Sequence, residues 1–410
     1  MRRLKKTLWT KNFTLVTAAS ALGAVGGIAG GFALSFLVFD ETGSTLASAL
    51  ILAIQLVPFF VLPLFLAPVM DRLPRKPFLV AGDLIDGVLY ALMGLYLLKF
   101  EFSYAAYLGY SLLLACLESF DELAFQSIYP KLIPEGMEQQ GYAVSTTLYP
   151  ILRVLMLPLA GVLLDAVGAA WILIGQGGLS LLAALIESNI DITEHRREGG
   201  EKLFTLRQWR ADIKEAAEYL KNERGVTGIF SYMAVTNGVA SGYSSILVAF
   251  FRTFPGFTAA MYSLFSVFEF AGRTLGGAVQ YKLKIAKEKK FGFTFLVYQI
   301  YETMDMCLLW LPYPLMLANR ALVGFLGANS ATMRQAAMQT YIPEELRARL
   351  NAFQNMLVTA ASGVLALAIG ALGEVLDYRL CVTICGATAF IAAWLLVWRR
   401  RADVRKIFEK

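Results

Sequence analysis

The chain has 410 residues, of which 57% are hydrophobic, and its mean hydropathy is +0.57. The apolar share is well above that of a soluble domain, and the apolar residues form roughly twelve runs of the ~20 residues that cross a bilayer. A soluble globular domain is therefore excluded, and the sequence predicts an all-α polytopic membrane protein. The formal net charge of +6 requires no nucleic-acid partner, because basic loops facing lipid account for it.

Six apolar spans are expected in the N-terminal half, after a short basic segment at residues 1–12. We interpret the first span as retained, because no small-residue cleavage site follows a short apolar core. The expected spans cover residues 13–39, 46–70, 78–98, 104–126, 142–164 and 169–188.

The fourth span carries three carboxylates, Glu118, Asp121 and Glu122. On a helix these positions are i, i+3 and i+4, so the three side chains lie on one face. A charge at the centre of a bilayer costs about 3 kcal/mol, so that face is expected to line a protein interior or a water-filled cavity. Two interpretations stay open: a structural ion-pair network, or the wall of a transport pathway that binds protons or ligand.

The fifth span carries Arg153 near its middle. Counting about 1.5 Å per residue from the loops places Arg153 at a depth similar to that of Glu118 and Asp121. A buried arginine needs an acidic partner, so we expect Arg153 to pair with one of these two carboxylates.

A long polar segment at residues 191–224 separates the two halves. It contains one apolar stripe with basic residues elsewhere, which predicts either an amphipathic helix on the membrane surface or a solvated linker helix. The stripe consists of Leu206, Trp209, Ile213, Ala217 and Leu220.

The predicted domains are a six-helix bundle at residues 1–189, a cytoplasmic linker at 190–225, and a second six-helix bundle at 226–410.

Six further spans are expected in the C-terminal half, and most of their charged residues lie in three of them. Glu269 and Arg273 are four residues apart in the eighth span and predict a local ion pair. The ninth and tenth spans also carry charges: Glu302, Asp305, Arg320 and Arg334. The six expected spans cover residues 226–251, 258–281, 291–311, 314–341, 351–375 and 380–398.

The basic residues predict the orientation. Most of the 37 Lys and Arg lie in the two termini and in the loops after the even-numbered spans. The positive-inside rule then places both termini in the cytoplasm, which requires an even number of spans. We expect the protein in a bacterial inner membrane.

The two halves also share a weak internal repeat. The segment Ile133–Glu135 recurs as Ile342–Glu344, and the residues that follow stay in register for about forty positions without a gap. Two halves in the same orientation form parallel repeats, between which transporters of this kind bind substrate near the middle of the membrane. The charges are not repeated, since Asp121 aligns with Ser330.

The loop after the second span, Ala67–Lys76, resembles the signature loop of the major facilitator superfamily. The two glycine positions of that pattern hold Ala67 and Pro74. The resemblance covers nearly all of the chain and implies two parallel-repeat six-helix bundles. The segments at residues 40–44 and 82–85 further resemble the bacterial macrolide-efflux and siderophore-exporter branch. The resemblance implies that this loop is a conformational latch formed by Asp71, Arg72, Arg75 and Lys76. We add Asp83, a nearby carboxylate of the third span, to the expected latch residues.

The sequence therefore predicts a secondary active transporter, a proton-coupled exporter of a small amphipathic, drug- or siderophore-like molecule that works by alternating access. Two alternatives stay open: a lipid or lysolipid flippase or an importer on the same fold, and a receptor or scaffold without transport. The expected partners are the substrate, protons and membrane lipids, with each chain acting as a monomer. The candidate cavity residues are Glu118, Asp121, Glu122, Arg153, Glu269, Arg273 and Arg320.

Enzyme chemistry is not expected, because the chain has no HExxH, GxSxG or phosphate-binding glycine motif. A soft-metal site is not expected either. The chain has a single histidine, His195, and its four cysteines all lie in predicted spans. We therefore predict no cofactor and no metal.

Overall fold

The computed structural model describes residues 7–70, 74–192, 214–215, 217–282 and 285–409. Each expected span corresponds to a helix, and no strand occurs among these residues, so the predicted all-α fold is confirmed. The predicted linker helix falls mostly outside the described residues. The spanning helices are α1 (Lys11–Thr42), α2 (Thr45–Met70), α3 (Lys76–Lys99), α4 (Tyr104–Leu132), α5 (Glu138–Val167), α6 (Ala169–Ser188), α8 (Arg224–Thr253), α9 (Ala259–Lys282), α10 (Lys287–Cys307), α11 (Tyr313–Tyr341), α12 (Glu344–Gly373) and α13 (Tyr378–Ala392).

Several helices run further than the apolar runs predict. Helix α1 continues to Thr42, through two acidic residues that were expected in a loop. The chain then reverses at Gly43, whose φ of 64° lies in the left-handed region that favours glycine. Helix α13 passes into a short π-helical stretch, η2 (Ala393–Trp398), and the basic tail forms a further helix, α14 (Arg401–Glu409).

Contacts divide the chain into two compact units. The first unit contains α1, α3, α4, α5, α6 and most of α2, and the second contains α8 and the helices from α10 onward. Helix α2 contributes its first turns to the second unit, within the stretch Gly43–Ala53. The first turn of α9, within Thr258–Ser263, belongs to the first unit, and the rest of α9 belongs to the second.

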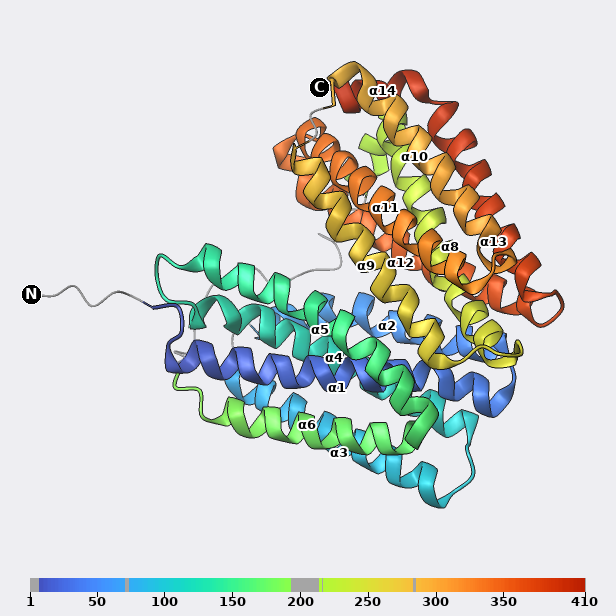
Figure 1. Ribbon diagram of the computed structural model, residues 1–410. Helices are drawn as coiled ribbons and strands as arrows, with labels where there is room; N and C mark the ends of the chain where they lie inside the picture. The colour runs from blue at the N-terminus through green and yellow to red at the C-terminus, as the bar shows by residue number, and fades with distance from the viewer. Residues whose placement is uncertain (1–6, 71–73, 193–213, 216, 283–284, 410) are drawn as a thin grey trace, which may run out of the picture. The chain divides into compact units, whose positions relative to one another are not determined.

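In the first unit, α3 and α6 lie side by side (Figure 1). Two glycines allow this close approach. A Cβ atom on Gly87 would lie 2.9 Å from the Gly177 carbonyl oxygen, and one on Gly177 would lie 2.6 Å from that of Gly87. The backbones therefore touch, as is common where small residues line the interface of membrane helices.

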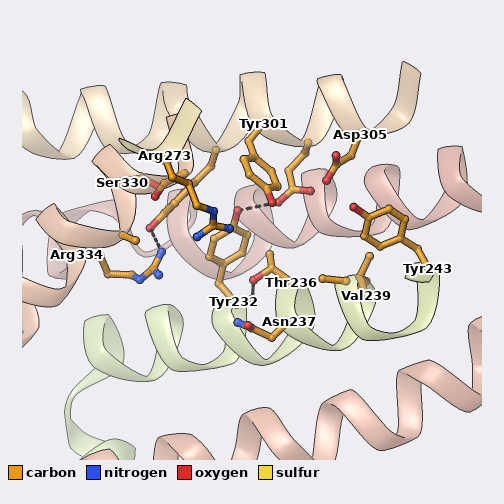
Figure 2. A pocket seen from close by; sticks show the side chains of 15 residues that line it. Tyr232, Thr236, Asn237, Val239, Tyr243, Arg273, Tyr301, Asp305, Ser330 and Arg334 are labelled. Atoms are coloured by element: carbon orange, nitrogen blue, oxygen red, sulfur yellow. Dashed lines mark hydrogen bonds between the residues drawn. The ribbon is translucent and has the colours of Figure 1, made fainter. Parts of the chain in front are cut away.

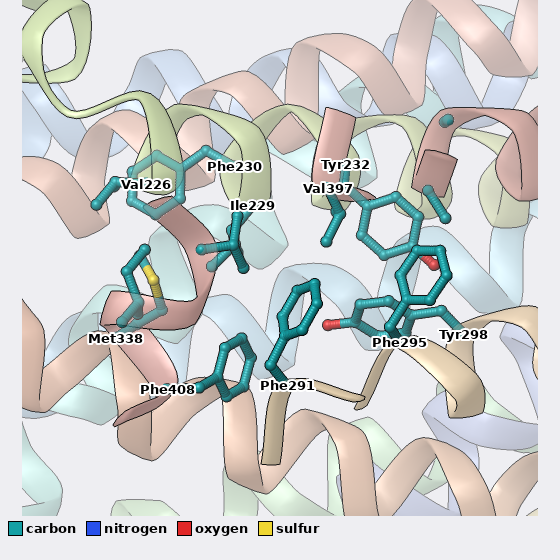
Figure 3. Packing of buried hydrophobic residues seen from close by; sticks show 14 of the residues in the cluster. Val226, Ile229, Phe230, Tyr232, Phe291, Phe295, Tyr298, Met338, Val397 and Phe408 are labelled. Carbon is teal, nitrogen blue, oxygen red and sulfur yellow. The ribbon is translucent and has the colours of Figure 1, made fainter. Parts of the chain in front are cut away.

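In the second unit, aromatic side chains of α8 and α10 form a buried core with the C-terminal helix (Figure 3). Phe291 and Phe295 of α10 pack with Phe230 of α8, and Phe408 of α14 closes this cluster. Helix α14 buries Val404 as well, so the C-terminal tail is a docked amphipathic helix and not only a basic extension.

Seven helices in the described part of the chain are long and apolar enough to cross a membrane. Helices α4, α9, α10 and α11 fall short of that measure. These are the helices that carry Asp121, Arg273, Asp305 and Arg320. The charged residues of the candidate site therefore lower the apolar character of the helices that hold them.

Candidate functional site

A cavity of about 290 Å³ lies within the second unit, between α8, α9, α10 and α11 (Figure 2). Its lining is rich in phenol, guanidinium and carboxylate groups, which is unusual in helices of a membrane protein. The polar residues that line it are Tyr232, Thr236, Asn237, Tyr243, Arg273, Tyr298, Tyr301, Glu302, Asp305, Ser330 and Arg334.

Helix α10 supplies one continuous polar face to this cavity. Tyr298, Tyr301, Glu302 and Asp305 are spaced i, i+3, i+4 and i+7, so they lie on one side of the helix. Glu302 and Asp305 were recognised from the sequence as charges within a span, but they were not among the expected cavity residues. The spacing of these four polar residues in an otherwise apolar helix was the signal that could have identified them.

Asp305 is neutralised by Arg320 of α11. An Arg320 Nη2 atom donates to Asp305 Oδ1, while Nη1 donates to the Tyr243 hydroxyl at 3.0 Å. The Arg320 side chain is only 2% exposed, so this is a buried ion pair with additional hydrogen bonds. Such bonds are needed to offset the loss of hydration of both charges.

Arg273 is paired within its own helix, as the spacing predicts. Its Nε and Nη2 atoms donate to the same oxygen of Glu269, at 3.0 and 2.7 Å. Arg273 lines the cavity, whereas Glu269 is not among its lining residues.

Arg334 and Glu302 differ from these pairs because each is held by a tyrosine. Arg334 Nη1 donates to the Tyr298 hydroxyl at 3.2 Å, and the Tyr232 hydroxyl donates to Glu302 Oε1 at 3.1 Å. The two tyrosine rings pack against each other with centroids 4.6 Å apart. Among the described residues, neither Arg334 nor Glu302 forms an ion pair.

A second group of charges lies in the first unit, where α4 faces α3. The Asp121 carboxylate packs on Gly82 of α3, where an added Cβ would lie 2.8 Å from its Oδ1 atom. Asp83 and Asp86 of α3 and Glu187 of α6 are close enough to Asp121, or to one another, to repel. We call Asp83, Asp86, Glu118, Asp121 and Glu187 the acidic cluster.

Two members of the acidic cluster are buried, Asp83 and Asp121 are half-buried, and Glu118 is exposed. Asp86 is 9% exposed and Glu187 is 3% exposed. One oxygen each of Asp86, Asp121 and Glu187 has no hydrogen-bond partner among the described residues. Asp86 and Glu187 were not among the site residues expected from the sequence.

The expected partner of the acidic cluster is not in place. Arg153 is exposed, and no ion pair joins it to Glu118 or Asp121, all three of which the structure describes. Counting residues gave the depth of Arg153 but not its direction around the helix, and Asp121 faces α3 instead of α5. Glu122 is exposed and accepts a hydrogen bond from Gln126.

The predicted latch is only partly described. Asp71 and Arg72 lie outside the described residues. Lys76 begins α3 and donates to the Ser188 carbonyl oxygen at the end of α6, at 2.7 Å. Asp83 lies in the acidic cluster, and no ion pair joins it to Arg75.

Comparison with known proteins identifies the fold. The sequence model of the Major Facilitator Superfamily matches residues 14–298 and 304–409. None of the curated proteins compared matches this chain by sequence.

Solved structures of several transporters are similar over nearly the whole chain. A bacterial homologue of the human lysosomal transporter Spinster, in an inward-facing unoccupied conformation, has a TM-score of 0.66 at 13% identity, covering 97% of this chain and 96% of its own. A POT family transporter bound to a thioalcohol-conjugated peptide has a TM-score of 0.68 at 11% identity, with 96% of each chain covered. The nucleoside transporter NupG has a TM-score of 0.68 at 11% identity, covering 94% of this chain and 98% of its own. At this level of identity, the likeness concerns the fold alone.

Proposed function

Because this chain belongs to the major facilitator superfamily, we propose that it is a proton-coupled secondary active transporter that exports a small amphipathic molecule by alternating access. That it is an integral membrane transporter follows from the family and the fold. The direction of transport, the coupling to protons and the class of substrate are proposals.

The observation that carries the proposal is the charged cavity of the second unit. Ionisable residues within membrane helices are costly and mark substrate or ion pathways. The volume of about 290 Å³ is at the lower end of the range typical of small-molecule pockets. Both features favour a small polar or amphipathic substrate over a lipid with long acyl chains.

The acidic cluster supports coupling to protons. Crowded carboxylates in a poorly hydrated site repel one another, and this repulsion is relieved when one of them takes up a proton. Proton uptake and release there would change the charge of the first unit during a transport cycle. Asp121 is central to this proposal because it faces α3 directly.

The remaining proposals concern topology and gating. The distribution of Lys and Arg supports both termini in the cytoplasm, and we propose a bacterial inner membrane as the location. The contact from Lys76 to the end of α6 supports a latch at the start of α3. We also retain Glu118, Glu122 and Arg153 of the first unit, and Glu269, Arg273 and Arg320 of the second, as proposed transport residues.

Transport is tested in proteoliposomes that contain the pH-sensitive dye pyranine. Compounds from a panel of small amphipathic molecules are added, and a true substrate is expected to produce proton movement that protein-free liposomes lack. Reversal of the flux with the sign of the imposed pH gradient would show proton coupling, and substrate movement opposite to the protons would show the antiport that proton-driven export requires.

Asp121→Asn is expected to abolish proton movement while uncoupled substrate exchange persists. Glu135→Gln, which alters an exposed carboxylate in the loop after α4, is the matched control and should leave the signal intact. Normal proton movement in Asp121→Asn would remove Asp121 from the coupling role. Binding of compounds without any flux would support a receptor instead of a transporter.

A further inference from the structure

The cavity of the second unit contains one positive and one negative charge that do not neutralise each other. These charges are Arg334 on α11 and Glu302 on α10, and both line the cavity. Glu302 is only 3% exposed, yet its one hydrogen bond within the described part of the chain is accepted from the Tyr232 hydroxyl. A buried carboxylate held by one neutral donor is left with a large share of its lost hydration unreplaced.

Each of the two charges is held by one member of a tyrosine pair. Tyr298 and Glu302 are four residues apart on α10, and Tyr298 holds Arg334 while Tyr232 holds Glu302. The rings of Tyr232 and Tyr298 pack together, so the two tyrosines that hold the guanidinium and the carboxylate are in contact. In Figure 2, Arg334 lies at one end of the cavity, and Asp305 and Tyr243 lie at the other.

The other charges of the cavity are already neutralised. Asp305 is bound to Arg320, and Arg273 is bound to Glu269. Among the described residues that line the cavity, the charged groups without an oppositely charged partner are therefore one guanidinium, of Arg334, and one carboxylate, of Glu302. A cationic ligand would leave Arg334 without a counter-charge, and an anionic ligand would do the same to Glu302.

We propose that this cavity binds a zwitterionic ligand, whose anionic group pairs with Arg334 and whose ammonium group pairs with Glu302. The inference rests on the proposed function, because it names the substrate class of the same cavity. Only a ligand with both charges neutralises both side chains at once. The guanidinium offers the geometry that a carboxylate prefers, and the tyrosine rings offer faces that attract an ammonium group.

Size limits the ligand further. A cavity of about 290 Å³ suits a molecule of amino-acid or dipeptide size with an apolar side chain. Val239 and Ala240 line the same cavity and supply an apolar surface for that side chain. The proposed substrate class is therefore a small zwitterion with an apolar group.

Four probes of one skeleton test this directly on the purified full-length protein in detergent. Phenylalanine is the zwitterion, N-acetylphenylalanine is the anion, phenylalaninamide is the cation, and N-acetylphenylalaninamide is neutral. Affinity is measured by isothermal titration calorimetry at pH 7. We expect phenylalanine to bind about tenfold or more tightly than either singly charged probe, since each loses one charge-assisted hydrogen bond. The neutral probe is expected to bind most weakly.

Two variants assign each charge to its side chain. Arg334→Gln should remove the preference for phenylalanine over phenylalaninamide, and Glu302→Gln should remove the preference for phenylalanine over N-acetylphenylalanine. Arg399→Gln and Glu409→Gln carry the same chemical changes at exposed positions near the C-terminus and should leave all four affinities unchanged.

The native protein alone can overturn the proposal, so it does not depend on the folding of a variant. Equal affinities for the four probes, tighter binding of a singly charged probe, or no binding of any probe would each contradict a zwitterion site. The proposed function fails separately, if probes bind with the expected order but no compound is transported in proteoliposomes. Transport of neutral compounds without charge preference would leave the function standing and remove this inference.

Discussion

The carboxylates of the acidic cluster have no basic partner within ion-pair distance among the described residues of the first unit, whereas Asp305 and Glu269 of the second unit are each paired with an arginine. Both arrangements lie in helices that cross a membrane. The first leaves an excess of negative charge that a proton can relieve. In the second, each carboxylate is paired with an arginine, so no excess of charge is left to relieve.

The internal repeat explains how one scaffold supports both arrangements. Glu118 and Asp121 of α4 align with Gly327 and Ser330 of α11, and both of these small residues line the cavity. The repeat thus places the same helix face toward a polar interior in each unit. In the second unit that face carries small residues and borders the cavity. In the first unit it carries carboxylates, which belong to the acidic cluster.

The largest expected effect comes from breaking the neutralised arrangement. Asp305→Asn would leave the buried guanidinium of Arg320 without its carboxylate. Removing one partner of a buried ion pair costs about 3–5 kcal/mol, so we expect a large fall in the thermal unfolding midpoint in detergent. The double variant Asp305→Leu with Arg320→Met should recover much of that loss. An unchanged midpoint in Asp305→Asn would mean that the pair contributes nothing to stability.

A steric change tests the packing of the acidic cluster. Gly82→Ala adds a Cβ that would lie 2.8 Å from Asp121 Oδ1. Overpacking of this kind costs about 1–3 kcal/mol, and alanine recovers up to about 1 kcal/mol of helix propensity. We expect a lower unfolding midpoint, restored when Asp121→Ala is combined with it. Gly109→Ala in α4, where a Cβ meets nothing within 4 Å, is the control and should not destabilise.

Removing a charge from the acidic cluster should have the opposite sign from removing one in the second unit. Asp121→Asn keeps the shape of the side chain but relieves repulsion with its acidic neighbours. We expect stability at pH 7 to rise by on the order of 1 kcal/mol, measured as a higher unfolding midpoint. A fall similar to that of Asp305→Asn would show that an unseen partner neutralises Asp121.

The sequence predicts the scaffold well because each helix is specified locally. An apolar run of bilayer length determines a span, and the spacing of Glu269 and Arg273 determines a pair within one helix. The tail helix α14 could also have been predicted, since Val404, Ile407 and Phe408 follow helical spacing.

Contacts between helices could not be predicted in the same way. Asp305 and Arg320 lie on different helices, and their pairing depends on how α10 and α11 are rotated against each other. The same uncertainty made the expected partner of Asp121 wrong. Depth along a helix follows from counting residues, but direction around it depends on packing that a single sequence does not specify.

The smallest expected effect concerns a carboxylate that is stabilised in a third way, by a helix N-terminus. Glu374 follows α12, and its Oε1 atom accepts hydrogen bonds from the Leu46 amide at 2.9 Å and from the Ser44 hydroxyl at 2.7 Å. Burial opposes ionisation of Glu374, but these bonds and one from Thr45 outweigh it. They lower the pKa of this carboxyl below its ordinary value of 4.5.

A carboxyl whose pKa is lower in the folded state than in the unfolded state stabilises the fold at pH values above its unfolded-state pKa. That stabilisation is lost as the pH falls through its folded-state pKa. We therefore expect Glu374→Gln to lower the unfolding midpoint slightly at pH 7. The difference from the native protein should shrink as the pH falls below about 4.5. Glu41→Gln, at a nearby exposed carboxylate, should show no such dependence. A difference that stays constant with pH would mean that Glu374 acts by its shape alone, and that its charge does not stabilise the start of α2.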